Sequence, residues 1–262
     1  MKCEKIENKY INLCVDLIMP GLNIRAEDLI VKAKTNYKVK TLGYNSAGFE
    51  DGEVAEEFYR CCKSFGIKPV IGASYFFSRY KNAEYKDKRL IFLFALDSAG
   101  YNNLSRLRSV VRKSEEIDYP TLNDYKNGLL CAYRINGNHI ETEETVFNVA
   151  RDIFQSNLYV CCQRPEQVDY ARAFAAEHGV KAVVFDTVKY ADGNDYKEYL
   201  KQRARFINNF GEKKPSEEAR LIPDDYYIKT YSDMIKKYPT AGDLIENTVE
   251  ITEKCNPELN FK

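Results

Sequence analysis

Residues 39–77, VKTLGYNSAGFEDGEVAEEFYRCCKSFGIKPVIGASYFF, decide the fold of this chain. The stretch begins and ends with runs rich in β-branched, aliphatic and aromatic residues, Val39–Tyr44 and Lys68–Phe77, which predict two strands. Between them, Glu53–Phe65 predicts a helix that ends at Gly66. Two strands joined through a helix are typical of a parallel βαβ unit.

The same alternation continues in both directions along the 262 residues. The seven expected strands are Tyr10–Val15, Val39–Tyr44, Lys68–Phe77, Arg89–Leu96, Gly128–Tyr133, Asn157–Cys162 and Lys181–Val188. The expected helices are Arg25–Thr35, Glu53–Phe65, Ala99–Lys113, Glu143–Phe154 and Pro165–His178. Seven strands that alternate with helices predict an α/β fold with parallel strands, and its compact closed form is a distorted (β/α)7 barrel of the TIM-like kind. An open, doubly wound sheet is the structural alternative.

The C-terminal part of the sequence has a different pattern. The polar stretch Asn208–Arg220 predicts an exposed loop or linker. Beyond it, Tyr226–Thr230 predicts a short strand, and Ser232–Tyr238 and Ala241–Cys255 predict helices. We therefore expect a barrel domain over residues 1–225 and a strand–helix extension over 226–262, which leads toward a further domain.

Composition narrows the classes of function. The 39 basic and 39 acidic residues balance, which disfavours a free-standing nucleic-acid binder. No apolar run has membrane-spanning length, so we expect a cytoplasmic protein. The eight cysteines form no C-x-x-C pair and predict reduced, buried hydrophobic side chains. Only two histidines are present, too few for a histidine-rich metallohydrolase.

Several blocks of sequence, in collinear order, resemble one family. They are Ala26–Lys34, Glu57–Tyr59, Gly66–Gly72, Gly100–Leu104, Tyr227–Thr230, Ile245–Thr248 and Glu253–Asn256. Together they resemble the N-terminal PHP domain (polymerase and histidinol phosphatase) of bacterial DNA polymerase III alpha subunits. The blocks after residue 226 are the most specific, because PHP phosphatases outside the polymerases lack this extension. The resemblance implies a PHP-type barrel followed by a short helical extension.

The resemblance also implies where metal ligands would lie. Active PHP domains hold a zinc or manganese cluster at the carboxyl ends of the strands, with His, Asp, Glu and Cys ligands that fix the ions as they activate water. The first-strand motif, His-x-His-Ser/Thr, matches Cys14–Leu17, and the second, Thr-Asp-His-Gly, approximately matches Gly43–Ser46. The nine positions that match lost ligands are Asn12, Cys14, Asp16, Asn45, Ser74, Leu90, Ile135, Thr187 and Lys189.

These replacements predict no catalytic residue, no metal and no cofactor. Leu90 and Ile135 cannot ligate an ion, and Lys189 would repel one. Cys14 and Asp16, with Asn12, could form a weak residual site, although ordinary strand-end residues are the better interpretation.

We expect a catalytically inactive PHP domain that serves as a structural or docking platform in DNA replication. The implied partners are the polymerase core of the same parent chain, which is a DNA-directed DNA polymerase, and a proofreading exonuclease subunit. The domain alone is expected to bind neither membrane nor nucleic acid. The alternatives are a metal-dependent PHP phosphoesterase or 3'-5' exonuclease, and a free-standing interaction protein with a polymerase-derived fold.

Overall fold

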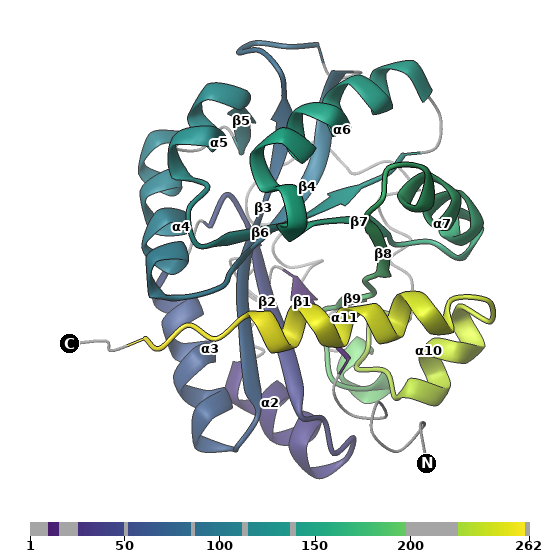
Figure 1. Ribbon diagram of the computed structural model, residues 1–262. Coiled ribbons are helices and arrows are strands. Elements are labelled where there is room, and N and C mark those ends of the chain that lie inside the picture. Colours follow the sequence, from purple (N-terminus) through teal and green to yellow (C-terminus); the bar gives the residue numbers. More distant parts are fainter. Residues whose placement is uncertain are drawn as a thin grey trace.

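The computed structural model describes residues 10–15, 26–49, 52–84, 87–111, 115–136, 140–197 and 225–259 (Figure 1). Its strands are β1 Asn12–Val15, β2 Thr41–Ala47, β3 Lys68–Ser78, β4 Arg89–Ala95, β5 Glu116–Asp118, β6 Leu129–Arg134, β7 Leu158–Cys162, β8 Lys181–Val184 and β9 Thr187–Val188. Its helices are α2 Ala26–Thr35, α3 Gly52–Ser64, α4 Ser98–Val111, α5 Tyr119–Tyr125, α6 Ile140–Phe154, α7 Val168–Glu177, α10 Tyr231–Lys237 and α11 Gly242–Lys254. Six expected strands and all five expected barrel helices are confirmed, with shifts of a few residues at their ends. The seventh expected strand, Lys181–Val188, is divided into β8 and β9.

The strands form one curled sheet in the order β8-β7-β6-β4-β3-β2-β1-β9. Only Phe185 and Asp186 separate β8 from β9, so one short segment pairs first with β7 and then with β1. The order therefore follows the chain and returns to its start, as in a barrel. A doubly wound sheet would instead reverse its strand order near the middle.

One strand contradicts the prediction that all the units are parallel. Strand β4 is antiparallel to both of its neighbours, β3 and β6. The connection from β3 to β4 spans only residues 79–88, and so short a connection favours an antiparallel return. This arrangement is one way in which the barrel departs from a TIM barrel.

Two short elements were not predicted, β5 and α5. Strand β5 pairs with the end of β3, beyond the reach of β2. Helix α5 begins at the N-cap Asp118, whose side chain accepts a hydrogen bond from the Thr121 amide at 3.1 Å. In the extension, both helices are confirmed, but Tyr226–Thr230 contributes only one isolated bridge, between Tyr227 and Tyr190. The expected loop at 208–220 lies outside the described residues.

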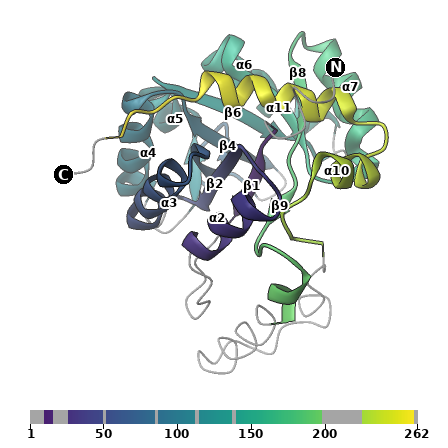
Figure 2. The ribbon, with the colours of Figure 1, turned by 90° about the horizontal axis from the view of Figure 1, so that it is seen from below.

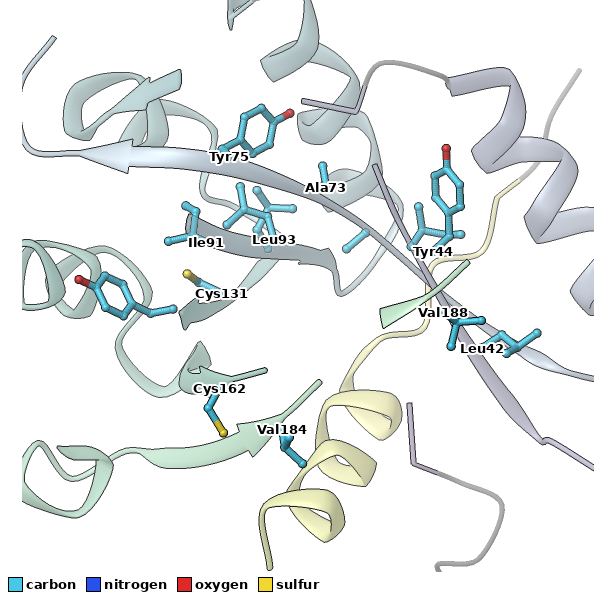
Figure 3. Packing of buried hydrophobic residues seen from close by; sticks show 14 of the residues in the cluster. Leu42, Tyr44, Ala73, Tyr75, Ile91, Leu93, Cys131, Cys162, Val184 and Val188 are labelled. Atoms are coloured by element: carbon cyan, nitrogen blue, oxygen red, sulfur yellow. The ribbon is translucent and has the colours of Figure 1, made fainter. Parts of the chain in front are cut away.

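The barrel has two hydrophobic layers because side chains alternate across each strand. The larger layer lies between the strands and the helices and includes Leu42, Tyr44 and Ile135. Figure 3 shows members of this layer on strands around the barrel, with Tyr44 and Tyr75 directed toward the surrounding helices. The smaller cluster fills the lumen. Its members are Ile11, Leu13, Val70, Phe92, Phe94, Leu130, Ala132, Tyr159, Cys161, Val183 and Phe185 from the barrel, with Ile251 and Cys255 from the extension.

Contacts between rings across the lumen show that it is a packed core. Phe185, next to β8, makes edge contacts with Phe92 and Phe94 of β4, at centroid distances of 5.9 and 5.6 Å. Strands β4 and β8 are not neighbours in the sheet, so these rings meet through the interior. A Cβ added to Gly72 would lie 2.6 Å from the Phe94 ring. Glycine is needed there because the lumen is already full.

Helix α11 covers the end of the barrel at which the parallel strands begin. The Thr248 hydroxyl accepts from the Ile11 amide at 3.3 Å, and the Asn247 amide donates to the Ala182 carbonyl at 2.8 Å. Just after the helix, the Asn256 amide donates to the carbonyl of Leu96, which follows the antiparallel β4. Figure 2 shows α11 along this end and the segment after β9 at the opposite end. None of the described helices is both long and apolar enough to cross a membrane.

Candidate functional site

The carboxyl ends of the parallel strands form the only end of the barrel that α11 does not cover. In barrels of this kind, functional side chains project from the carboxyl ends of the strands. The site is therefore defined by the side chains that face the lumen at that end. Strand register decides which of the nine ligand-matching positions are among them.

Asn45 faces the lumen and is the most unusual of these residues. Its Cα pairs with Gly72, whose missing side chain would point at Phe94, so the two positions share the lumen face. The Asn45 side chain is fully buried, and neither its Oδ1 nor its Nδ2 atom has a hydrogen-bond partner. A buried amide normally has protein or water partners. Asn45 is thus the ligand-matching position at which a bound water or ion would be best accommodated.

Ser74, Leu90 and Thr187 also lie on the lumen side. Ser74 is two residues beyond Gly72 on β3, and Thr187 pairs with the lumen residue Leu13. Leu90 packs against the lumen cluster and is two residues before Phe92. These three positions carry a serine hydroxyl, a hydrocarbon and a threonine hydroxyl. This layer of the lumen is therefore mostly neutral.

Arg134 is a lumen residue that the sequence analysis missed. It follows Ala132 by two residues on β6, and its Cα pairs with the lumen residue Cys161. The side chain is half-buried, and its Nε atom is buried without a hydrogen-bond partner. Its position at the end of an expected strand was a usable signal. A guanidinium at this end of the lumen opposes the binding of a metal cation.

Asn12 and Ile135 lie on the other face of the sheet. Asn12 pairs with Leu42, and both Leu42 and Ile135 belong to the outer hydrophobic layer. The Asn12 side chain is committed to the backbone of Lys229: its Oδ1 accepts from the amide at 3.1 Å, and its Nδ2 donates to the carbonyl at 3.3 Å. The amide of Asn12 is thus occupied by the extension and is separated by the sheet from Asn45.

The remaining three ligand-matching positions are Cys14, Lys189 and Asp16. The Cα of Cys14 pairs with Tyr44 and Val188, which are residues of the outer layer. Lys189 follows β9, and its amide donates to the Tyr226 carbonyl at 2.8 Å, so it lies beside the extension. Asp16 falls outside the described residues. The structure therefore gathers some of the nine positions in the lumen and places others outside it.

The described cysteines are poor metal ligands. All six are free thiols, and five are fully buried, as predicted from their sequence context. Burial raises the pKa of Cys161, which faces the lumen, well above its ordinary value despite the nearby charge of Arg134. Burial likewise raises the pKa of Cys162 to about 12. A metal binds the thiolate, so thiols in this environment act as small apolar groups. Among the described residues, no group of three His, Cys, Asp or Glu side chains is placed to hold an ion.

The main concentration of charge is at the seam between β9 and β1, on the outer side. Asp186, between β8 and β9, pairs with Lys229 and Lys237 of the extension, in each case at 2.9 Å. Lys229 was noticed in the sequence only as part of the Tyr227–Thr230 block, and Asp186 was not singled out. Their pairing spans 43 positions between residues 186 and 229, which no local pattern could indicate.

A strand ring in chain order, a packed lumen and a polar layer at the carboxyl end define an α/β barrel protein. Comparison with known proteins shows which proteins its sequence is similar to. No protein-family model matches the chain. The chain is 25% identical over 269 residues to the DNA polymerase III alpha subunit of Aquifex aeolicus, covering 88% of this chain and 23% of that protein.

Further alpha subunits show the same relationship. That of Neisseria meningitidis serogroup A is 27% identical over 268 residues (91% of this chain, 22% of that protein), and that of Bacillus subtilis is 26% identical over 241 residues (84% and 21%). The chain is homologous over most of its length to the N-terminal PHP region of the DNA polymerase III alpha subunit, and it spans about a fifth of the length of these relatives.

Solved structures with a similar course of the chain include a proposed metal-dependent phosphoesterase of Bifidobacterium adolescentis, with a TM-score of 0.43 and 11% identity over 70% of this chain and 87% of that one. A two-domain protein of Bacteroides vulgatus containing a predicted PHP-like metal-dependent phosphoesterase gives a TM-score of 0.41 and 10% identity, over 68% and 52% of the two chains.

Proposed function

We propose that this chain is a catalytically inactive PHP domain that acts as a structural and docking platform in DNA replication. One observation carries the proposal: three of the side chains at the ligand-matching positions serve packing or the extension. Leu90 packs against the lumen core, Ile135 is buried in the outer layer, and Asn12 binds the backbone of Lys229. A metal cluster needs several anionic or imidazole ligands at one place, with supporting groups behind them.

The rival function is a metal-dependent phosphoesterase or 3'-5' exonuclease. It is favoured by the description of one similar solved structure as containing a predicted PHP-like metal-dependent phosphoesterase. It is also favoured by the Asn45 amide in the lumen, which has no hydrogen-bond partner. An amide oxygen is a weak ligand for zinc, and the guanidinium of Arg134 lies on the same face. Cys14 and Asp16 would have to supply the anionic ligands.

Metal content and turnover distinguish the two functions. The protein is purified without a metal-affinity column, its bound metal is measured by elemental analysis, and it is titrated with zinc and with manganese. The platform proposal expects less than one ion per ten chains, no saturable binding at micromolar metal, and no chelator-sensitive hydrolysis of a generic phosphoester. Stoichiometric metal together with chelator-sensitive turnover would overturn it, and loss of both in Cys14→Ala or Asp16→Ala would then locate the ligands.

The docking part of the proposal concerns a particular surface. Tyr80, Val110 and Tyr119 are the most exposed large hydrophobic residues in the described part of the chain, with 65, 49 and 38% of their area exposed. Val110 lines a hollow of about 300 Å³, and Tyr80 and Tyr119 are next in sequence to two of its other lining residues, Lys81 and Asp118. The proposed occupant is the polymerase region of the parent chain, since the matched part makes up only 22–23% of the relatives' length.

A binding measurement tests this surface. The chain is mixed with a separately produced polymerase region that follows the PHP region in an alpha subunit, and the affinity is measured by calorimetry. Tyr80→Ser with Tyr119→Ser should weaken binding about tenfold or more, as for aromatic contacts at an interface. The control is Tyr37→Ser, a tyrosine near the start of β2. Equal affinity of the double variant and the unchanged chain would exclude this surface. Capture of a proofreading exonuclease in place of the polymerase region would assign the surface to that subunit.

A further inference from the structure

The pairing between β9 and β1 is the weakest place in the strand ring. Within the described part of the chain, two registered pairs connect these strands, Leu13 with Thr187 and Cys14 with Val188. Every other pairing around the ring has at least four. A barrel has no free edges only while its last pairing is made. The seam between β9 and β1 therefore needs support from outside the sheet.

Lys229 of the extension supplies that support from both sides of the seam. Its backbone binds β1: the amide donates to Asn12 Oδ1, and the carbonyl accepts from Asn12 Nδ2 and from the Tyr10 hydroxyl. Its ammonium group pairs with Asp186, in the link between β8 and β9, at 2.9 Å. One residue therefore holds the two segments that the short strand pairing joins.

Helix α10 strengthens the same junction. Lys237 lies on this helix, and its ammonium group is 2.9 and 3.1 Å from the two carboxylate oxygens of Asp186. The Tyr238 hydroxyl donates to the Gln163 carbonyl, just after β7, at 2.9 Å. The capping box of Thr230 and Asp233 starts α10 directly after Lys229. The position of Lys229 is thereby fixed to the start of the helix.

Burial makes these contacts cooperative. Tyr10, Asn12, Asp186 and Lys229 each expose less than a tenth of their area. Opening the seam while residues 225–238 stay docked would separate these groups from their partners, and undocking residues 225–238 would leave the buried Asp186 carboxylate without either lysine. Both half-open states are costly because unpaired buried charges and amides lose water without a compensating bond.

We propose that residues 225–238 form a clasp, so that the β9–β1 seam and α10 open and close together as one unit of the fold. The clasp links the extension to the start of β1 and to the residues between β8 and β9. Displacement of the extension by a partner, or by chain that follows it, would open the lumen at the seam. This inference does not depend on whether the domain is an enzyme or a platform.

Hydrogen exchange of the full chain, followed by mass spectrometry, tests the clasp. Lys229→Met removes the ammonium group and should raise exchange in β1, β9 and α10 together by about 100-fold, as expected for breaking a buried ion pair. Strands β3, β4 and β6 should keep their protection. The matched control is Lys181→Met, because Lys181 also joins the barrel to the extension, through Glu250, but its side chain is 58% exposed. Exchange in this control should rise less than threefold.

Two results would overturn the proposal. Faster exchange in α10 with unchanged β1 and β9 would mean that Lys229 only docks a helix. Faster exchange in all strands would mean that the seam is not a separate unit. If Lys229→Met fails to fold, Tyr10→Phe removes a single hydroxyl that bonds to the clasp. It should raise hydrogen exchange in β1, β9 and α10 together by about tenfold.

Discussion

Replacing Asn45 with leucine should stabilise the protein, which is a rare outcome for a core substitution. The Asn45 amide is fully buried, and no partner satisfies either of its polar atoms. An unsatisfied buried polar group costs about 1–3 kcal/mol, and leucine has a similar shape and adds apolar burial. We expect the free energy of unfolding to rise by about 1–2 kcal/mol, which for a domain of this size raises Tm by about 3–6 °C.

Asn12→Leu is the matched control for this substitution. Asn12 is also a buried asparagine on a neighbouring strand, but both of its side-chain polar atoms bond to Lys229. Its replacement should cost about 2–4 kcal/mol, because the Lys229 backbone then loses two buried hydrogen bonds. Urea unfolding measures both variants, with an unchanged m value showing that only stability has altered. A loss of more than about 1 kcal/mol in Asn45→Leu would refute the reasoning, since it would show that Asn45 holds a water or ion that matters.

Three further predictions concern interactions elsewhere in the fold. Burial tends to raise the pKa of Glu250, but hydrogen bonds from Lys181 and other groups outweigh it and lower the value from 4.5 to about 2. The ion pair of Glu250 with Lys181 therefore stabilises the fold above pH 4.5, and this stabilisation is lost as the pH falls toward 2. After solvent screening, the stabilisation is about 1 kcal/mol. In Glu250→Gln, the free energy of unfolding should depend less on pH between 4.5 and 2. Arg89→Met should cost about 3–5 kcal/mol in urea unfolding, because it removes the positive charge that lies 3.3 Å from the buried carboxylate of Glu143. Adding Glu143→Gln should recover much of the loss. Phe185→Ala should cost about 3–5 kcal/mol by calorimetry, because it empties the middle of the packed lumen, and a cost under 1 kcal/mol would contradict the packed-core description.

The barrel was predictable because its signals are local. Each strand is a short apolar run, and each helix has one apolar face, so their order along the chain follows from the sequence alone. The direction of β4 was predicted wrongly because the length of the connection at 79–88 was not weighed against the length that a crossover helix needs. Helix α5 was missed although Asp118, followed by a proline at 120, is an ordinary helix start.

The place of the site-residue positions in the fold could not be predicted. Aligned motifs predict which positions match lost ligands, yet they do not give the face of the sheet. On a strand, a shift of one residue moves a side chain from the lumen to the outer layer. Asn12 and Asn45 are both amides at ligand-matching positions, and only the register of β1 with β2 shows that they lie on opposite faces.

The placement of charge gives a physical reason to regard this barrel as a scaffold. A metal phosphoesterase must hold several like-charged ligands together at the carboxyl end of the lumen. Their repulsion lowers the stability of the fold, and the bound metal ions offset this loss. Here the described lumen is filled by aromatic and aliphatic side chains, and its one identified cation, Arg134, would repel such ions. The buried acid–base pairs are instead on the outer side, where Asp186 meets Lys229 and Arg89 meets Glu143. Charges in those places hold helices and seams together, and they are far better suited to keeping a surface in position for a partner than to activating water.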